Sequence, residues 1–543
     1  MSTVTDPVLP RDVLPGAGPA ESRPRLGRVR PRAGSALRRE ILRDRMTLAG
    51  LGLLSIVVSL WNLNGSPGYS EDGGTYTAQA FSVLNGSLAP YTYWYDHPPL
   101  GWIQLGALAW IPYSLGFGDG TYIGATRYVI TLYFVATALL IFLLARRLRI
   151  RRPIAALAVV ILVLSPLSLI LGRQIYLDNI GATWLLLAFY LALSPRKALW
   201  HHIAAGVFFA VAVLSKETLA IFGPALLLAM LNRPRWSNRN FSIVGFLFVG
   251  GLVLSFYPLM ALLRGELLAG ANHVSLQEAL TYQFFSRSGS GYIWEAGTER
   301  AELLNGWLYY DRYIIAAGLA AAVLCLLRRR TLWIPVAIVS FAIPVFIGQG
   351  YLPAMYIIGV LPYFVLALGA ALNVLWDGVE RLAATGPASR RPLARAAGAA
   401  VIAAGIVLMS VPQWFEQDRE LLTAQANEDW LLTLNWVKEN VPREDTVLTP
   451  YSMWQELNSG AGWHDPWTMV VTEKADLDRQ FAVEHPEGWT AVDWVIVGPI
   501  VRSNIEALGL TTVAEALAHA TPAAVYGEWG VYRVANTPVD APG

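Results

Sequence analysis

Cysteine is almost absent from this sequence of 543 residues, because Cys325 is the single copy. One cysteine excludes an intrachain disulfide and any motif that needs paired thiols. Charge is also scarce: Asp, Glu, Lys and Arg make up 15% of the chain, whereas 55% of it is hydrophobic. An ordinary soluble domain of this size does not have such a composition, so the sequence predicts a membrane protein.

Nucleotide-binding motifs are absent as well. The sequence contains no P-loop, and no GxGxxG follows a predicted strand. We therefore expect no nucleotide site on the inner side of the membrane and no nucleic-acid partner. An activated donor that reacts outside, where nucleotides are scarce, is expected to be linked to a lipid.

The first 45 residues are rich in Pro, Gly and Arg and contain ten Arg. This composition is typical of a disordered segment, and we expect residues 1–45 to form a basic cytoplasmic tail. The segment does not have the pattern of a signal peptide, because the first apolar run begins only at Met46.

Long apolar stretches dominate residues 46–412. A helix needs about 20 apolar residues to cross the ~30 Å hydrocarbon core of a bilayer. The sequence predicts a mainly α, multi-pass membrane domain over this range, with about eleven transmembrane helices. The expected spans are 46–64, 122–145, 154–172, 179–194, 201–215, 217–231, 241–263, 312–327, 331–348, 353–376 and 396–412.

The stretch 99–115 decides the topology. If it crosses the membrane, the basic loop 146–152 lies outside; if it lies along the surface, every basic loop lies inside. The second arrangement places 27 basic residues inside and none in 65–121, as the positive-inside rule predicts. Gln104 and Pro112 also suit an interfacial helix. We expect a plasma-membrane protein with eleven spans, its N-terminus in the cytoplasm and its C-terminus outside.

The composition changes after Pro412. Residues 413–543 carry 20 acidic against 7 basic residues, and the long apolar runs stop. The run NEDWLLTLNWVKENVP predicts an amphipathic helix, and TVLTPY, DWVIVGPI and GVYRV predict short buried strands. We expect a small extracytoplasmic α/β domain over this range.

The first outer loop, 65–99, contains no Lys or Arg and three carboxylates, Glu71, Asp72 and Asp96. Carboxylates beside a bilayer are costly, and they either stabilise a cation or take part in proton chemistry. Asp72 begins a predicted helix, DGGTYTAQAFSVLNG, and Asp96 lies in WYDHPPL next to His97.

Two further outer turns carry polar residues at the same membrane depth. Arg173 and Asp178 lie in GRQIYLDN, and Lys216 and Glu217 lie in LSKET. Cations at the bilayer edge can hold the phosphate of a lipid carrier and stabilise it as a leaving group. A carboxylate can take the proton from an attacking hydroxyl. Each residue alone could be a solvated loop end, but together they favour a site.

Four segments of the sequence resemble those of the GT-C glycosyltransferases. They are the acidic residue before a Tyr-bearing helix, then WYDHPPLGW, the Leu-Asp turn in GRQIYLDN and the Ser-Lys turn in LSKET. The similarity is to the branch that contains protein O-mannosyltransferases and the aminoarabinose transferases that modify lipid A. It covers 46–412 and is strongest over 60–225. It implies a polyprenyl-phosphate sugar donor, inversion at the anomeric carbon, and an acidic loop built as two helices lying on the membrane.

The resemblance assigns roles in the first loop. The family has Asp-Glu followed by a Tyr; here Asp72 takes the Asp position, Gly73 takes the Glu position, and Tyr76 follows. Because Glu71 precedes Asp72, the acidic pair is shifted. Asp72 is the expected catalytic base, with Asp96 and Glu71 as the other catalytic candidates.

The remaining site residues are carried over in the same way. His97 falls where the family has a phosphate-binding Lys, so Lys216 or an Arg from 280–312 is expected to share that role. The expected donor-phosphate contacts are His97, Arg173 and Lys216. The expected substrate contacts, besides Tyr76, are Asp178, which matches the acidic outer turn of the family, and Glu217.

The expected function is an inverting hexosyl- or pentosyltransferase that moves a sugar from a polyprenyl phosphate to an extracytoplasmic glycan, lipid or protein. No cofactor is expected; a divalent metal held by Glu71, Asp72 and Asp178 is the alternative. Two other classes are compatible with acidic residues at the membrane edge. One is a proton- or cation-coupled transporter, and the other is a non-catalytic scaffold with an outer binding domain.

Overall fold

The computed structural model describes residues 32–196, 198–231, 238–270, 273–287, 289–348 and 350–535. Of the tail predicted for residues 1–45, residues 1–31 lie outside the described part of the chain. From Arg32 the chain is helical, so the first helix begins before the predicted span.

All eleven predicted spans coincide with helices. These are α1 (Arg32–Leu60), α4 (Tyr122–Arg147), α5 with α6 (Arg152–Leu164, Pro166–Arg173), α7 (Leu177–Ala192), α8 (Leu199–Ser215), η1 with α9 (Glu217–Phe222, Gly223–Leu231), α10 with α11 (Arg239–Leu254, Phe256–Leu263), α13 (Glu299–Cys325), α14 (Trp333–Phe346), η3 with α15 (Ala354–Gly359, Leu361–Thr385) and α16 (Arg391–Thr423). Among the described residues, five helices are long and apolar enough to cross a membrane by length and composition.

One of the predicted spans is broken. Helices α5 and α6 meet at an angle of 63°, and α6 starts at Pro166, whose ring cannot continue the preceding helix. The Ser165 side chain accepts a hydrogen bond from the Ser168 amide, which caps the new helix. The remaining helices between α1 and α16 are α2 (Glu71–Leu84), α3 (Leu100–Ser114), α12 (Leu276–Thr281), η2 (Tyr282–Ser286) and η4 (Ala388–Arg390).

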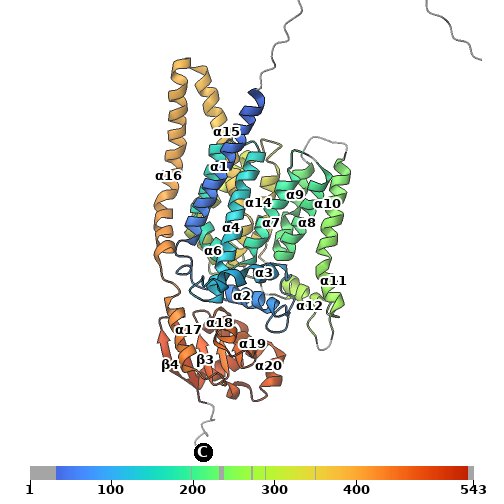
Figure 1. Ribbon diagram of the computed structural model, residues 1–543, viewed down its shortest axis with the longest axis vertical. Coiled ribbons are helices and arrows are strands. Elements are labelled where there is room, and N and C mark those ends of the chain that lie inside the picture. Colours follow the sequence, from blue (N-terminus) through green and yellow to red (C-terminus); the bar gives the residue numbers. More distant parts are fainter. Residues whose placement is uncertain are drawn as a thin grey trace, which may run out of the picture. The chain divides into compact units, whose positions relative to one another are not determined.

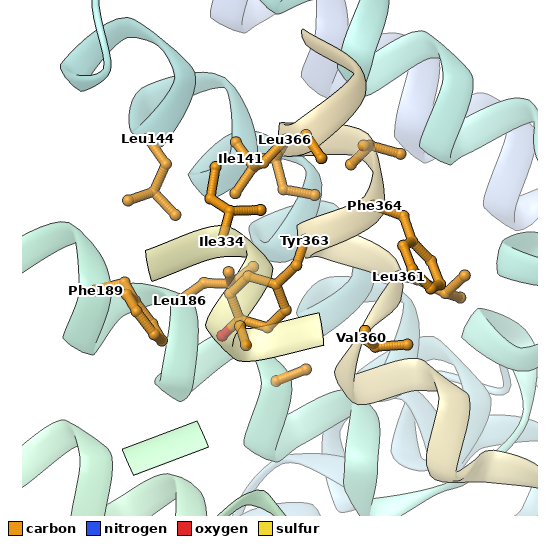
Figure 2. Close-up of a cluster of buried hydrophobic side chains, with 14 of the residues drawn as sticks. Ile141, Leu144, Leu186, Phe189, Ile334, Val360, Leu361, Tyr363, Phe364 and Leu366 are labelled. Atoms are coloured by element: carbon orange, nitrogen blue, oxygen red, sulfur yellow. The ribbon is translucent and has the colours of Figure 1, made fainter. Parts of the chain in front are cut away.

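The helices pack around an apolar core that surrounds α15. Tyr363 is fully buried there, in one cluster with Leu186 and Phe189 of α7 and Ile334 of α14 (Figure 2). Phe189 stacks on Trp333 with ring centroids 4.7 Å apart. This core holds together the helices whose ends carry the polar turns at 173–178 and 216–217.

The segment 65–121, which contains the acidic loop, forms two helices, α2 and α3, as the resemblance implied. Figure 1 shows α2 and α3 lying across the ends of the long helices, with the C-terminal domain beyond them. They pack closely because Gly106 of α3 has no side chain: a Cβ there would meet the Ala80 carbonyl oxygen at 2.4 Å.

The C-terminal part contains one five-stranded sheet with the order β2-β1-β3-β5-β4. Strands β1, β2 and β3 are parallel, and β5 is antiparallel to both β3 and β4. The strands are β1 (Val447–Thr449), β2 (Met469–Val471), β3 (Trp494–Val497), β4 (Ala520–Tyr526) and β5 (Trp529–Val534). The helices of this part are α17 (Glu428–Asn440), α18 (Tyr451–Ala461), α19 (Thr472–Leu477), α20 (Arg479–Glu484), η5 (Gly488–Ala491), α21 (Val501–Leu508) and α22 (Thr511–Ala518).

The predicted helix and the three predicted strands of this domain are confirmed as α17, β1, β3 and β5. Strands β2 and β4 were not predicted.

Candidate functional site

The start of α2 positions Asp72, the first of the two aspartates of the first loop. The Ser70 hydroxyl accepts a hydrogen bond from the Gly73 amide at 3.1 Å and caps the helix. Asp72 therefore lies in the first turn, where the positive end of the helix dipole stabilises a carboxylate. Asp72 and Asp96 line the same cavity, whose volume is about 250 Å³.

The cavity has walls from two parts of the chain. Its first wall comes from α2 and the loop that follows it, and the second from the C-terminal domain through Tyr451, Glu473 and Lys474. Four aromatic residues also line the cavity: Tyr91, Tyr93, Trp94 and Tyr451. A cavity with several polar groups among aromatic rings is typical of a small-molecule site.

Three residues predicted as ligand contacts form a chain of hydrogen bonds. Lys216 Nζ lies 3.0 Å from His97 Nε2, and His97 Nδ1 lies 3.1 Å from Glu217 Oε1. An ammonium group has only donors, so Nε2 accepts from Lys216 and Nδ1–H donates to Glu217. Glu217 thereby sets the tautomer of His97, and His97 in turn holds the ammonium of Lys216 in one position.

The same group of charges acts on the predicted base. Lys216 is the positive charge that acts most strongly on Asp72, and the charges of Asp96 and Arg287 also act on it. Burial raises the pKa of Asp72 above its ordinary value, and the positive charge of Lys216 opposes that shift. A carboxylate with a raised pKa is a stronger base, which suits proton abstraction near neutral pH.

Two further predicted contacts lie in this group. Asp178 is 2% exposed, and its carboxylate is one of the charges that act on Lys216. Tyr76 is buried, with the rings of Tyr76 and His97 centred 6.3 Å apart. The structure thus brings together Asp72, Asp96, His97, Lys216, Asp178, Glu217 and Tyr76 from four segments of the chain.

Glu71 faces a different partner. Its carboxylate accepts hydrogen bonds from the Ser452 hydroxyl at 2.8 Å and the Ser452 amide at 3.2 Å. Burial, and then the charge of Glu473, raise the pKa of Glu71 to about 7. Glu71 connects α2 to α18 and does not line the cavity with Asp72.

The alternative metal site is not formed in this structure. Because Glu71 is held by Ser452, it does not converge with Asp72 and Asp178. Across the part of the chain that the structure describes, no group of three or more His, Cys, Asp or Glu side chains is arranged to hold a metal ion.

Arg173 also lies outside the group. It is fully buried and donates hydrogen bonds to the backbone carbonyls of Ser66, Val58 and Trp61. Arg127, which the sequence did not single out, binds the carbonyls of Leu63, Pro67 and Gly68 in the same way. Both guanidinium groups hold the start of the first outer loop, so Arg173 serves the fold here rather than a donor phosphate.

The sequence analysis did not identify the site residues that come from the C-terminal domain, Glu473 and Lys474. Arg287, one of the Arg residues in 280–312, has a charge that acts on Asp72, and its guanidinium lies 4.0 Å from the centre of the Tyr351 ring. Glu473 and Lys474 gave no motif. The one signal for Lys474 is that basic residues are rare after residue 412.

Known proteins resemble this chain in sequence and in fold. Residues 96–260 match the sequence model of the family described as dolichyl-phosphate-mannose-protein mannosyltransferase. No curated protein matches the chain by sequence.

Two solved structures resemble the whole chain. ArnT from Cupriavidus metallidurans bound to undecaprenyl phosphate has a TM-score of 0.56 at 14% identity, over 91% of this chain and 99% of that chain. The archaeal oligosaccharyltransferase AglB from Archaeoglobus fulgidus, in complex with an inhibitory peptide and a dolichol-phosphate, has a TM-score of 0.54 at 13% identity. That match covers 93% of this chain and 75% of AglB.

The chain is therefore a membrane protein with the GT-C fold. The resemblance of its sequence to the GT-C glycosyltransferases of the protein mannosyltransferase and ArnT branch is confirmed by the family match and by these structures.

Proposed function

We propose that the protein is an inverting glycosyltransferase that moves a sugar from a polyprenyl-phosphate donor to a hydroxyl of an extracytoplasmic acceptor. The observation that carries the proposal is the cavity shared by Asp72 and Asp96, which lies beside the Lys216–His97–Glu217 chain. A base and a phosphate-binding cation are the two groups that this reaction needs.

In the proposed reaction, the acceptor oxygen attacks the anomeric carbon while the bond from that carbon to the phosphate oxygen breaks. Asp72 takes the proton of the acceptor hydroxyl, and Asp96 orients that hydroxyl. The leaving polyprenyl phosphate gains negative charge, which Lys216 stabilises, with Arg287 as a second cation on the same side. His97 and Glu217 position Lys216, with the Tyr76 ring beside His97 and the Asp178 charge acting on Lys216.

A lipid-linked donor is supported by the relatives. ArnT was solved with undecaprenyl phosphate, and AglB with a dolichol-phosphate. The absence of a P-loop or dinucleotide-binding motif in the sequence agrees with a donor that is not a nucleotide sugar.

The direct test is to incubate the purified protein in nanodiscs with polyprenyl-phosphate sugars and an extract of envelope glycans, lipids and proteins. Release of free polyprenyl phosphate, measured by mass spectrometry and lost in Asp72→Asn, supports the proposal. Flux of a solute or proton across liposomes without any lipid-linked donor, and no such release, would instead identify a transporter. No release of polyprenyl phosphate by the wild type, together with an unchanged phenotype of cells that carry Asp72→Asn, would favour a scaffold.

A further inference from the structure

The C-terminal domain contributes a buried cation to the candidate site. Lys474 of α19 is 9% exposed, and its Nζ lies 3.7 Å from the centre of the Trp94 ring and 5.8 Å from that of Tyr91. A lysine ammonium is seldom buried without a partner, because its desolvation is costly. Within the described part of the chain, no carboxylate lies within 4.0 Å of this ammonium and no hydrogen bond from it is found. The ammonium packs on the Trp94 ring and interacts with the charges of Asp478, Asp96 and Glu473. The N–H donors that do not face the ring are therefore open to a ligand in the cavity.

A buried acceptor without a partner lies in the same cavity. Gln79 of α2 is 7% exposed, and its Oε1 atom has no donor among the described residues. Unpaired buried polar atoms are uncommon in folded proteins and often mark a place where something binds. Lys474 offers hydrogen-bond donors and Gln79 offers an acceptor. A ligand that pairs with both residues therefore needs both acceptors and donors.

The loop that carries Trp94 is tied to the domain that carries Lys474. The Tyr91 hydroxyl donates to the Met469 carbonyl at 3.1 Å and accepts from the Val471 amide at 3.0 Å. Next to Lys474, Glu473 also lines the cavity. The two walls are therefore joined by hydrogen bonds and form one binding surface.

The size and chemistry of the cavity select among ligand classes. About 250 Å³ is below the roughly 300–1,000 Å³ of sites for drug-sized ligands, so the cavity fits one small ring. The Asp72 and Asp96 carboxylates can accept hydrogen bonds from ligand hydroxyls, and the Lys474 ammonium can donate to the same hydroxyls. Glu473 also lines the cavity; its carboxylate accepts from the Asn504 amide at 2.8 Å and the Thr472 hydroxyl at 2.9 Å, which fix its position. A Ser or Thr side chain of a peptide has a single hydroxyl, which would leave most of these groups unpaired. Three carboxylates also disfavour an anionic ligand.

We propose that this cavity is the acceptor subsite and that it binds one sugar ring of a glycan acceptor, with Lys474, Glu473 and Gln79 as specificity-determining residues. The proposal rests on the proposed function, because it places the acceptor hydroxyl next to Asp72. It narrows the acceptor from a glycan, lipid or protein to a carbohydrate, and it makes the C-terminal domain a part of the site.

Binding can be measured without turnover. Saturation-transfer NMR of the full-length protein in nanodiscs would use methyl hexopyranosides and methyl pentofuranosides at millimolar concentration as probes. At least one glycoside is expected to bind. Lys474→Gln, Glu473→Gln and Gln79→Ala are each expected to weaken its binding by about tenfold, since each removes a charge or a hydrogen-bonding group from the lining of the cavity. Lys438→Gln, a lysine of the same domain outside the cavity, is the matched control and should bind like the wild type.

Folding of each variant is checked by its thermal unfolding temperature. If no glycoside binds, or if binding is unchanged in all three cavity variants, the subsite is refuted. Binding of a Ser- and Thr-containing peptide or of inorganic phosphate at this cavity, in place of the glycosides, also refutes it. Glycoside binding that depends on Lys474, together with no release of polyprenyl phosphate in the transfer assay, would keep the subsite and reject glycosyl transfer.

Discussion

At the scale of single residues, Asp72 and Glu71 are neighbours in the chain with different surroundings. Asp72 lines the cavity with Asp96, whereas the carboxylate of Glu71 is bound by Ser452. Successive residues of a helix point about 100° apart, so one of the two faces the cavity and the other faces α18. Of this acidic pair, Asp72 is therefore the candidate base, and Glu71 is the residue that joins α2 to α18.

We expect Asp72→Asn to lower kcat by about 10²–10⁴-fold, because the amide cannot accept the proton of the acceptor. Donor binding should be retained, since the substitution keeps the size of the side chain. Glu71→Gln is the matched control and should remain active, because its amide oxygen can still accept from Ser452. Both are measured by polyprenyl phosphate release. A dead Glu71→Gln with an active Asp72→Asn would move the base by one residue.

The pH dependence of the reaction should report Asp72. The residue must be charged to accept a proton, and burial raises its pKa above the ordinary value of 3.8. The rate, kcat/KM, is therefore expected to fall as the pH decreases through this raised pKa, so the acidic limb lies above the range of a free aspartate. A limb below the ordinary value in the pH–rate profile would contradict the assignment.

Lys216 should affect both the rate and this profile. Its positive charge lowers the pKa of Asp72, so Lys216→Gln is expected to move the acidic limb to higher pH. Loss of the phosphate contact should also raise the donor KM if Lys216 binds the ground state, and lower kcat if it stabilises the leaving group. If the profile, KM and kcat are all unchanged, Lys216 is not part of the site.

At the scale of elements, the contact between α2 and α18 holds the two walls of the cavity together. A Cβ on Gly74 would lie 2.2 Å from the Tyr451 carbonyl oxygen and 2.3 Å from the Ser452 amide nitrogen. These are backbone atoms of Tyr451 and of Ser452, the residue that binds the Glu71 carboxylate. Backbone atoms cannot move aside as a flexible side chain would.

Gly74→Ala is therefore expected to separate α2 from α18, to destabilise the protein by about 1–3 kcal/mol through overpacking, and to reduce transfer activity. Thermal unfolding and limited proteolysis of the C-terminal domain measure the two effects. Gly378→Ala in α15 is the control, because nothing lies within 4 Å of a Cβ there. Equal stability of the two variants would show that the contact is dispensable.

At the scale of the whole molecule, the orientation in the membrane is the main prediction. With α3 at the surface, residue 114 lies outside and residue 149 lies inside. In a Cys325→Ala background, a membrane-impermeant thiol reagent should label Ser114→Cys in intact cells and Arg149→Cys only after permeabilisation; both native side chains are exposed. Labelling of position 149 from outside would contradict the eleven-span topology.

Much of the fold could be read from local patterns. The apolar stretches form helices because a helix is the structure in which an apolar run of that length can be embedded in a bilayer with its backbone groups paired. Helix α17 has an amphipathic pattern, and strands β1, β3 and β5 lie in short apolar runs. Strand β2 has only three residues, and β4 contains Pro522 and is mostly exposed. Neither has a pattern that a sequence alone distinguishes from a loop.

The sequence by itself determined the class of the protein, the acidic first loop, and the set of charged residues at one end of the helices, because hydropathy and charge are properties of local segments. Only the tertiary structure decided how these residues are used. It placed Arg173 on backbone carbonyls, turned Glu71 to Ser452, and brought Lys474 to Trp94 across some 380 residues of chain. Such contacts depend on how distant elements pack, and local composition does not encode that packing.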